Sequence, residues 1–187
     1  PGCGHRTAFF GISKALGPGD ITVGDIGCHT LGALPPHNLG QIVLSMGHSV
    51  STASGLSLQN PNRNVIAFIG DGTLFHAGLP GIINAAVNNH NVCLVILENG
   101  TTAMTGHQPR PGTGEIGPTV SLTELLSVLG VKFIRDVDAY DVNGVANAVK
   151  EASAHPGFAA VIARHPCMLL FTRVKRKKMP NLKIPKI

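Results

Sequence analysis

Two short apolar runs, each followed by a polar turn, are the clearest signal in this chain of 187 residues. Residues 65–69 precede Gly-Asp-Gly, and residues 92–97 precede Glu-Asn-Gly. Runs that are apolar at every position are typical of strands buried on both faces of a parallel sheet. Residues 78–89, between the two runs, have the apolar spacing of a helix. Together these segments predict a right-handed strand–helix–strand unit.

The same alternation continues along the rest of the chain. Further strands are expected at 21–23, 41–44, 131–134 and 158–163, and further helices at 50–58, 122–129 and 141–154, with Asp141 placed to cap the last helix. This order predicts an α/β domain with a doubly wound, mostly parallel sheet and helices on both faces. The domain is expected to span residues 1–170. The long segment 100–121, rich in Gly, Pro and Thr, is expected to be a functional loop.

Charge is scarce and unevenly placed. Hydrophobic residues make up 43% of the chain and charged residues 13%, against roughly 25% charged in an average protein. This composition excludes a disordered chain and a coiled coil, and it indicates an oligomer or an assembly with other chains. Seven of the fifteen Lys and Arg residues lie in 173–187, which has no acidic residue. We therefore expect 171–187 to be a separate basic tail, solvated and partly disordered, with an acidic or nucleic-acid partner as the alternative.

The remaining residues carry eight basic and ten acidic groups, a net charge of −2. A domain without a basic face is not expected to bind nucleic acid. No apolar stretch approaches the roughly 20 residues that span a membrane. The chain starts at Pro1, without Met, which is consistent with a piece of a longer protein. Four scattered cysteines with no Cys-x-x-Cys pair indicate a reducing, cytoplasmic location.

Polar residues at two strand ends form the main candidate site. Asp71 and Asn99 follow neighbouring predicted strands, and ligands of open α/β sheets bind at the carboxyl ends of strands. Their oxygens suit Mg²⁺, and the adjacent Gly70 and Gly72 leave room for a phosphate group. Gly-Asp-Gly alone would more simply be a turn, but Asn99 at the next strand end favours the Mg²⁺ interpretation.

Gly70-Asp71-Gly72, followed after 26 residues by Asn99, resembles the diphosphate-anchoring motif of thiamine diphosphate enzymes. The segments 1–5, 24–28, 46–47 and 101–108 resemble those of the 2-oxoacid:ferredoxin oxidoreductases. Within that family, 27–36 and 102–114 most resemble the large (alpha) subunits of the indolepyruvate ferredoxin oxidoreductases. The resemblance runs from Pro1 to about residue 169 and covers the diphosphate-binding domain only.

The resemblance implies that Asp71, Asn99 and the main-chain carbonyl of Thr101 hold Mg²⁺. It places His5 and His29 near the diphosphate and Met46-Gly47 near the aminopyrimidine, and we expect His5, His29, His48 and His107 to lie in loops. The implied cofactor-binding residues are Cys3, Gly4, His5, Cys28, His29, Met46, Gly47, Gly70, Asp71, Gly72, Thr73, Asn99, Thr101, Met104 and Thr105. Thr105, His107 and Gln108 are expected in a lid that is mobile until the cofactor binds. Arg110 is a candidate for binding a substrate carboxylate, with a solvated loop arginine as the alternative.

The implied reaction converts a 2-oxoacid, CoA and oxidised ferredoxin to acyl-CoA, CO₂ and reduced ferredoxin, with an arylpyruvate such as indolepyruvate as the expected substrate. In the family, a carboxylate on a pyrimidine-binding domain activates the cofactor, and we find no candidate for it here. The implied partners are that domain, a small oxidoreductase subunit and ferredoxin. A non-redox thiamine diphosphate decarboxylase and a non-catalytic assembly subunit remain as alternatives.

The cysteines have their own alternatives. In many relatives, residues at positions like Cys3, Cys28 and a late cysteine such as Cys167, together with a further cysteine just before the position of Pro1, ligate a [4Fe–4S] cluster. On the residues alone, structural thiols are favoured, and zinc bound with neighbouring histidines is a further alternative. Cys93 lies within a predicted strand and is expected in the core.

Overall fold

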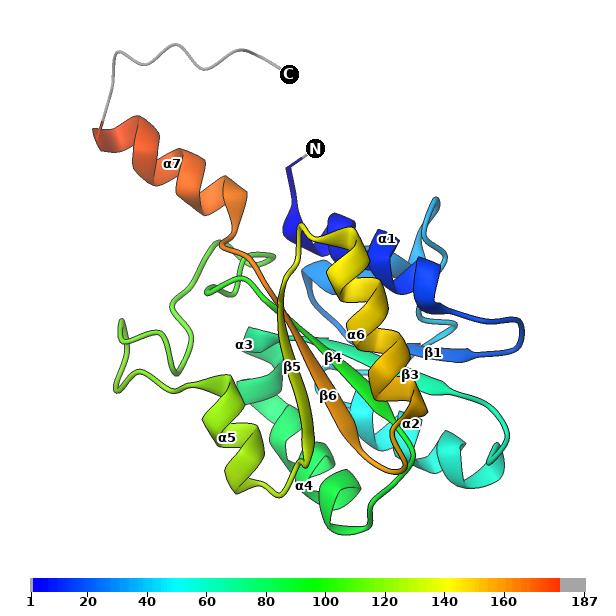
Figure 1. Ribbon diagram of the computed structural model, residues 1–187. Coiled ribbons are helices and arrows are strands. Elements are labelled where there is room, and N and C mark those ends of the chain that lie inside the picture. Colours follow the sequence, from blue (N-terminus) through cyan, green and yellow to red (C-terminus); the bar gives the residue numbers. More distant parts are fainter. Residues whose placement is uncertain (1, 179–187) are drawn as a thin grey trace.

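The computed structural model describes residues 2–178, and its centre is one six-stranded sheet (Figure 1). The strands are β1 (Ile21–Gly24), β2 (Ile42–Val43), β3 (Val65–Gly70), β4 (Cys93–Glu98), β5 (Phe133–Asp138) and β6 (Ala159–Arg164). Their order in the sheet is β2-β1-β3-β4-β6-β5, and each neighbouring pair is parallel. The expected α/β fold is therefore confirmed, and the sheet is parallel throughout.

Helices cover both faces of this sheet (Figure 1). On one face lie α1 (Gly4–Ala15) and α6 (Val142–Ala154), and on the other lie α2 (Ser49–Gln59), α4 (Leu79–Val87) and α5 (Leu122–Val128). A three-residue helical turn, α3 (Asp71–Thr73), and a wider turn over Leu74–Gly78 join β3 to α4 without a break. Asp141 caps α6 as expected, because its carboxylate accepts the Gly144 N–H at 2.9 Å.

The two apolar layers explain why the central strands are apolar at every position. Along β3, Ile66 and Phe68 pack toward α1 and α6, whereas Ala67 and Ile69 pack toward α2 and α4. All four side chains have no exposed surface. Burying a large apolar side chain contributes about 1.5–3 kcal/mol, so these central strands are a main source of stability.

Helix α1 was missed by the sequence analysis, and His5 lies in its first turn rather than in a loop. Two glycines conceal this helix, because glycine disfavours a helix interior. Gly11 is required by packing: a Cβ at this position would lie 2.8 Å from the Cβ of Val145 in α6. The close contact between α1 and α6 outweighs the local preference.

Two further expectations differ from the structure near the end of the chain. The fifth strand covers Phe133–Asp138 rather than 131–134, since an edge strand accepts charged residues such as Arg135 and Asp136. Helix α7 (Met168–Lys178) crosses the expected boundary at residue 170 and extends away from the domain (Figure 1). Residues 171–178 are thus helical rather than an unstructured tail. Residues 179–187 of that tail lie outside the described residues.

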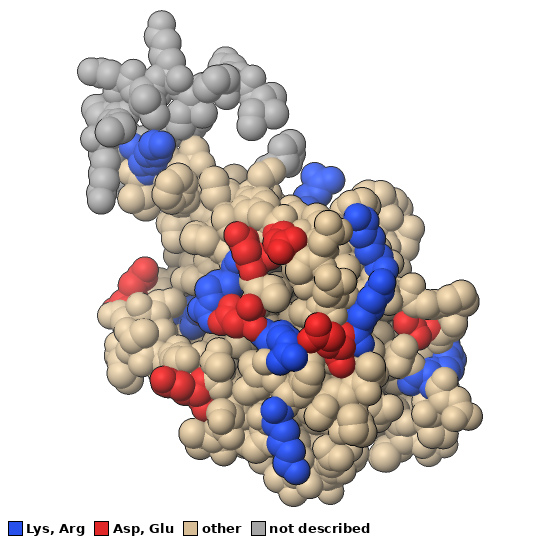
Figure 2. All heavy atoms as spheres, in the orientation of Figure 1, with Lys and Arg blue, Asp and Glu red and all other residues tan. Residues whose placement is uncertain are grey.

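Charged side chains gather on the face that carries α1, α6 and the edge strand β5 (Figure 2). By contrast, residues 26–62 and 72–97, which include α2 and α4, contain no Lys, Arg, Asp or Glu. In the part of the chain that the structure describes, no helix has both the length and the apolar character to cross a membrane.

Candidate functional site

A cavity of about 260 Å³ opens where the carboxyl ends of β1, β3 and β4 meet. Its lining residues are His5, Ile26, Gly27, Cys28, His29, Met46, Gly70, Asp71, Gly72, Thr73, Asn99, Thr101, Thr102, Ala103, Met104 and Thr105. The structure thus brings together all the expected cofactor residues except Cys3, Gly4 and Gly47. Ile26, Gly27, Thr102 and Ala103 are additional lining residues that the sequence analysis did not name.

Asp71 is the central acidic residue of this cavity and is only 2% exposed. Its Oδ1 accepts the Gly72 N–H at 2.8 Å. Its Oδ2 accepts the N–H groups of Asn99 at 3.1 Å and Gly100 at 2.8 Å, and also the Arg110 Nε–H at 2.7 Å. The carboxylate therefore joins the end of β3 to the end of β4, which places the side chains of Asp71 and Asn99 at the same site.

A second buried carboxylate, Asp25, shapes the neighbouring wall and was missed by the sequence analysis. Asp25 has no exposed surface and follows β1. It accepts the N–H groups of Ile26, Gly47 and Ser49 at 2.8, 2.6 and 2.8 Å. It thereby fixes the turn that carries Met46 into the cavity. An acidic residue directly after a buried strand, the same pattern as Asp71, was the available signal.

Gly47 supports this wall without lining the cavity. Its φ is +89°, and a Cβ there would lie 2.4 Å from the Cβ of Ala77. We expect Gly47→Ala to lower the free energy of unfolding by about 1–3 kcal/mol, because it adds both overpacking and backbone strain. Urea unfolding measures this change. Gly55→Ala, where a Cβ meets no atom within 4 Å, is the matched control. Equal loss in both variants would contradict the packing argument.

Two histidines reach the cavity with unpaired ring nitrogens. His5 is 7% exposed and His29 2%. Neither nitrogen of His5 nor Nε2 of His29 has a hydrogen-bond partner. Burial lowers the pKa of His5, and burial together with the nearby His5 lowers the pKa of His29 to about 3. Buried polar atoms without partners are uncommon in proteins, and these two rings line the cavity, where their nitrogens are available to a polar ligand.

The low pKa of His29 predicts a loss of stability in acid. The unfolded chain protonates this histidine below its ordinary pKa of 6.5, whereas the folded chain does not until about pH 3. Stability is therefore complete above pH 6.5 and falls on acidification, by about 1.4 kcal/mol per pH unit for one histidine. Urea unfolding at pH 7 and pH 5.5 checks this. His29→Gln should reduce the dependence, of which the buried His5 retains a share, and His76→Gln, at an exposed position, should leave it unchanged.

The comparisons with known proteins agree with this geometry. Residues 25–163 match the family model of the thiamine pyrophosphate enzymes, C-terminal TPP binding domain. The chain belongs to this family. It is 40% identical over 190 residues to the indolepyruvate oxidoreductase subunit IorA of Methanothermobacter thermautotrophicus, a match that covers 96% of this chain and 31% of that subunit. The IorA subunit of Archaeoglobus fulgidus is 42% identical over 185 residues, covering 95% and 30%.

A solved structure supports the fold of this thiamine pyrophosphate-binding domain. The 2-oxoglutarate:ferredoxin oxidoreductase from Magnetococcus marinus, with 2-oxoglutarate, coenzyme A and succinyl-CoA bound, superposes with a TM-score of 0.81 at 23% identity. That match covers 90% of this chain and 63% of the other. The domain spans only about a third of the length of the IorA subunits it matches.

The donor set of the thiamine pyrophosphate-binding domain fits its family's cofactor. Asp71 and Asn99 supply the oxygens that Mg²⁺ prefers, and His5 and His29 supply polar groups without partners. Thr73 completes this side of the site, since its hydroxyl donates to the Ile26 carbonyl at 3.0 Å and ties the first helical turn to the end of β1.

The loop 100–121 of this thiamine pyrophosphate-binding domain divides into two parts. Residues Thr101–Thr105 line the cavity, whereas His107, Gln108 and Arg110 do not. Thr102 and Gln108 exchange main-chain hydrogen bonds at 3.0 and 3.1 Å, and the Nδ1 of His107 lies 3.0 Å from Nη1 of Arg173 in α7. These contacts join the two ends of the segment 102–108 and connect it to α7, and a lid that is mobile until the cofactor binds stays a prediction.

Arg110 has protein partners in place of the expected substrate. It is only 3% exposed and forms ion pairs with Asp71 and Glu98. Arg110 is not among the residues that line the cavity, so the structure does not support a contact with a substrate carboxylate. Nor is it the solvated loop arginine of the alternative interpretation.

The cysteines of the thiamine pyrophosphate-binding domain fall into two classes. Cys93 is buried in β4, where burial raises the pKa of its thiol to about 12, and it is a core residue as expected. Cys28 lines the cavity, the N–H of Cys167 donates to the carbonyl of the cavity residue Asn99 at 3.0 Å, and Cys3 directly precedes α1. Burial raises the pKa of the Cys28 thiol. Among residues 2–178, however, no three His, Cys, Asp or Glu side chains are arranged closely enough to hold a metal ion.

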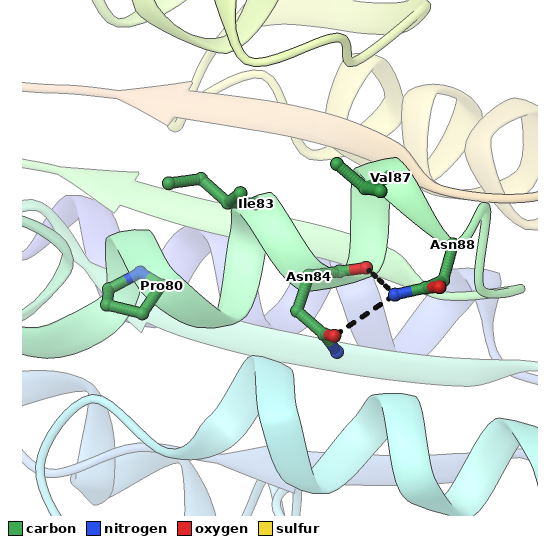
Figure 3. A pocket seen from close by; sticks show the side chains of 5 residues that line it. All are labelled: Pro80, Ile83, Asn84, Val87 and Asn88. Atoms are coloured by element: carbon green, nitrogen blue, oxygen red, sulfur yellow. Dashed lines mark hydrogen bonds between the residues drawn. The ribbon is translucent and has the colours of Figure 1, made fainter.

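A second hollow, of about 410 Å³, lies on the outer face of α4 (Figure 3). Its lining residues are Pro80, Ile83, Asn84, Val87 and Asn88. The side-chain amide of Asn88 donates to Asn84, and none of the five residues is charged. This hollow therefore offers no charged group to bind a diphosphate or a metal ion, whereas the cavity at the strand ends contains the carboxylate of Asp71.

Proposed function

We propose that this chain is the diphosphate- and Mg²⁺-binding part of a 2-oxoacid:ferredoxin oxidoreductase that acts on an arylpyruvate such as indolepyruvate. The observation that carries the proposal is the pairing of Asp71 and Asn99 at adjacent strand ends in a cavity with two unpaired buried histidines. The substrate class rests on the 40–42% identity to two IorA subunits.

Different residues of the cavity would bind different parts of the cofactor. Asp71, the side-chain oxygen of Asn99 and the carbonyl of Thr101 would bind Mg²⁺, and the ion would bind the diphosphate. His5 and His29 would donate hydrogen bonds to diphosphate oxygens, and Met46 would contact the ring portion. When bound, thiamine diphosphate supplies the nucleophilic carbon and stores the electrons that decarboxylation releases. The apolar side chains of Ile26 and Met104, which also line the cavity, would exclude water from the ring portion of the cofactor.

The complete reaction needs groups that residues 2–178 do not supply. A pyrimidine-binding domain would contribute the carboxylate that activates the cofactor, and a small oxidoreductase subunit would complete the enzyme. The 2-oxoacid and CoA would give acyl-CoA and CO₂, and ferredoxin would accept the two electrons. The short coverage of the IorA subunits is consistent with such further parts, and we propose a cytoplasmic location for the assembly.

We also propose that Cys3, Cys28 and Cys167 supply thiolates to an iron–sulfur cluster, with a fourth thiolate from a cysteine outside residues 1–187. The position of Cys28 in the cavity wall and the hydrogen bond from the Cys167 N–H to the Asn99 carbonyl support this. Anaerobic reconstitution of the assembled enzyme with iron and sulfide tests it. Bound iron and sulfide should disappear in Cys167→Ser and persist in Cys93→Ser. Bound zinc, or no metal at all, would contradict the cluster.

Viologen reduction by the assembled enzyme tests the proposed function. With thiamine diphosphate, Mg²⁺ and CoA present, indolepyruvate should support faster reduction than pyruvate or 2-oxoglutarate, and omitting CoA should stop turnover. Conversion of the 2-oxoacid to an aldehyde without viologen reduction would instead indicate a non-redox decarboxylase. Absence of turnover in an assembled, cofactor-loaded enzyme would indicate that this chain belongs to a non-catalytic assembly subunit.

A further inference from the structure

Arg110 is a buried cationic side chain that contacts the cavity residue Asp71. Its Nε donates to Oδ2 of Asp71 at 2.7 Å, its Nη2 to Oε1 of Glu98 at 2.9 Å, and its Nη1 to the Pro111 carbonyl at 2.7 Å. The guanidinium also lies 5.4 Å from the centre of the Phe75 ring. All three nitrogens have an acceptor, so the group is held in a single orientation.

The two carboxylate oxygens of Asp71 accept different numbers of hydrogen bonds. Oδ2 accepts three donors, from Asn99, Gly100 and Arg110, whereas Oδ1 accepts only the neighbouring Gly72 N–H. An ionised carboxylate has about four lone-pair positions, two on each oxygen. Oδ2 is therefore fully occupied by protein donors, and Oδ1 retains capacity for a further partner.

We propose that Arg110 is a positioning residue, which fixes the Asp71 carboxylate so that Oδ1 is presented to Mg²⁺. The proposal rests on the function proposed above, and it assigns Arg110 to the metal ligand rather than to the substrate. It also gives the loop 100–121 a role in metal binding, because this loop carries Arg110 back to the end of β3.

A charge network supports the orientation of Arg110. Glu98 pairs with Arg110 and with Arg164, and Arg164 pairs with Asp136 at 2.6 Å. With Asp71, the network crosses the ends of β3, β4, β6 and β5 and contains three carboxylates and two guanidinium groups. One net negative charge remains to attract a divalent cation. A planar guanidinium can bridge two carboxylates in fixed directions, which the point charge of a lysine cannot do.

The test is the Mg²⁺ concentration that gives half-maximal binding of thiamine diphosphate, measured by calorimetry because the chain has no Trp. Changing an outer residue that orients a metal ligand typically lowers metal affinity about 10–100-fold. We expect Arg110→Lys to raise the half-saturating Mg²⁺ concentration by that factor. Arg135→Lys is the matched control. Like Arg110, Arg135 pairs with a carboxylate and an aromatic ring: its Nε donates to Glu151 at 2.9 Å, and its guanidinium lies 4.4 Å from the centre of the Phe133 ring. Unlike Arg110, it is exposed and has no contact with Asp71. Arg135→Lys should leave Mg²⁺ binding unchanged.

An unchanged Mg²⁺ requirement in a folded Arg110→Lys variant would overturn the proposal, even if its thermal midpoint fell, because Arg110 would then be structural only. If that variant does not fold, Glu98→Gln tests the proposal instead. It leaves Asp71 and Arg110 paired and loosens the other end of the guanidinium, so the half-saturating Mg²⁺ concentration should rise several-fold, and no rise would overturn the proposal. If the unaltered chain shows no Mg²⁺-dependent binding, the proposed function fails first, and the role of Arg110 fails with it.

Discussion

Asp71→Asn is expected to reduce Mg²⁺-dependent binding of thiamine diphosphate by more than about 100-fold, because it removes the charged metal ligand itself. The same change should lower the free energy of unfolding by about 1–3 kcal/mol, since Arg110 loses one of its two buried carboxylate partners. Calorimetry for binding and urea unfolding for stability separate the two effects.

Asp141→Asn is the control for the stability effect of Asp71→Asn. Asp141 caps α6 at its N-terminus and is not part of the cavity. Weakening this cap should lower the free energy of unfolding by about 1 kcal/mol or less without altering cofactor binding. Equal Mg²⁺-dependent affinity in the unaltered chain and in Asp71→Asn would remove Asp71 from the metal site.

The second large effect concerns catalysis by the isolated chain. Without a pyrimidine-binding domain, we expect 2-oxoacid-dependent viologen reduction to be at least about 100-fold slower than in the assembled enzyme, the usual contribution of a positioned acid or base. Among the described residues that line the cavity, Asp71 is the single carboxylate, and three donors already occupy its Oδ2. No other acidic side chain there is available to activate the cofactor.

Adding the pyrimidine-binding domain of the same enzyme should restore turnover. A domain in which the activating carboxylate has been replaced by an amide is the appropriate control, because it should bind without restoring activity. Turnover by the isolated chain, supplied only with cofactor, CoA and substrate, would refute the division of the active site between two domains.

The parts of this molecule that were predictable from sequence are those with a short-range pattern. The apolar runs of β3 and β4 predicted two strands buried on both faces, and parallel strands place their carboxyl ends at one edge. That is why Asp71 and Asn99 could be brought together before the structure was known. The cap at Asp141 likewise depends on residues only three positions apart.

The parts that were missed depend on long-range packing. The glycines of α1 conceal a helix whose stability comes from contact with α6. Arg110 meets Asp71 across 39 positions of the chain, and Asp25 bonds to Gly47 across 22. No local pattern in the loop 100–121 distinguishes a solvated arginine from one buried between two carboxylates.

Binding of the diphosphate end of the cofactor through Mg²⁺ is the role that we propose for this chain. Calorimetric competition tests it most directly, with thiamine diphosphate titrated into the chain in Mg²⁺ or in EDTA and with inorganic diphosphate or unphosphorylated thiamine as competitor. We predict one saturable site that requires Mg²⁺, displacement by inorganic diphosphate, and no displacement by thiamine. Binding that survives EDTA, or that thiamine displaces and diphosphate does not, would contradict the account.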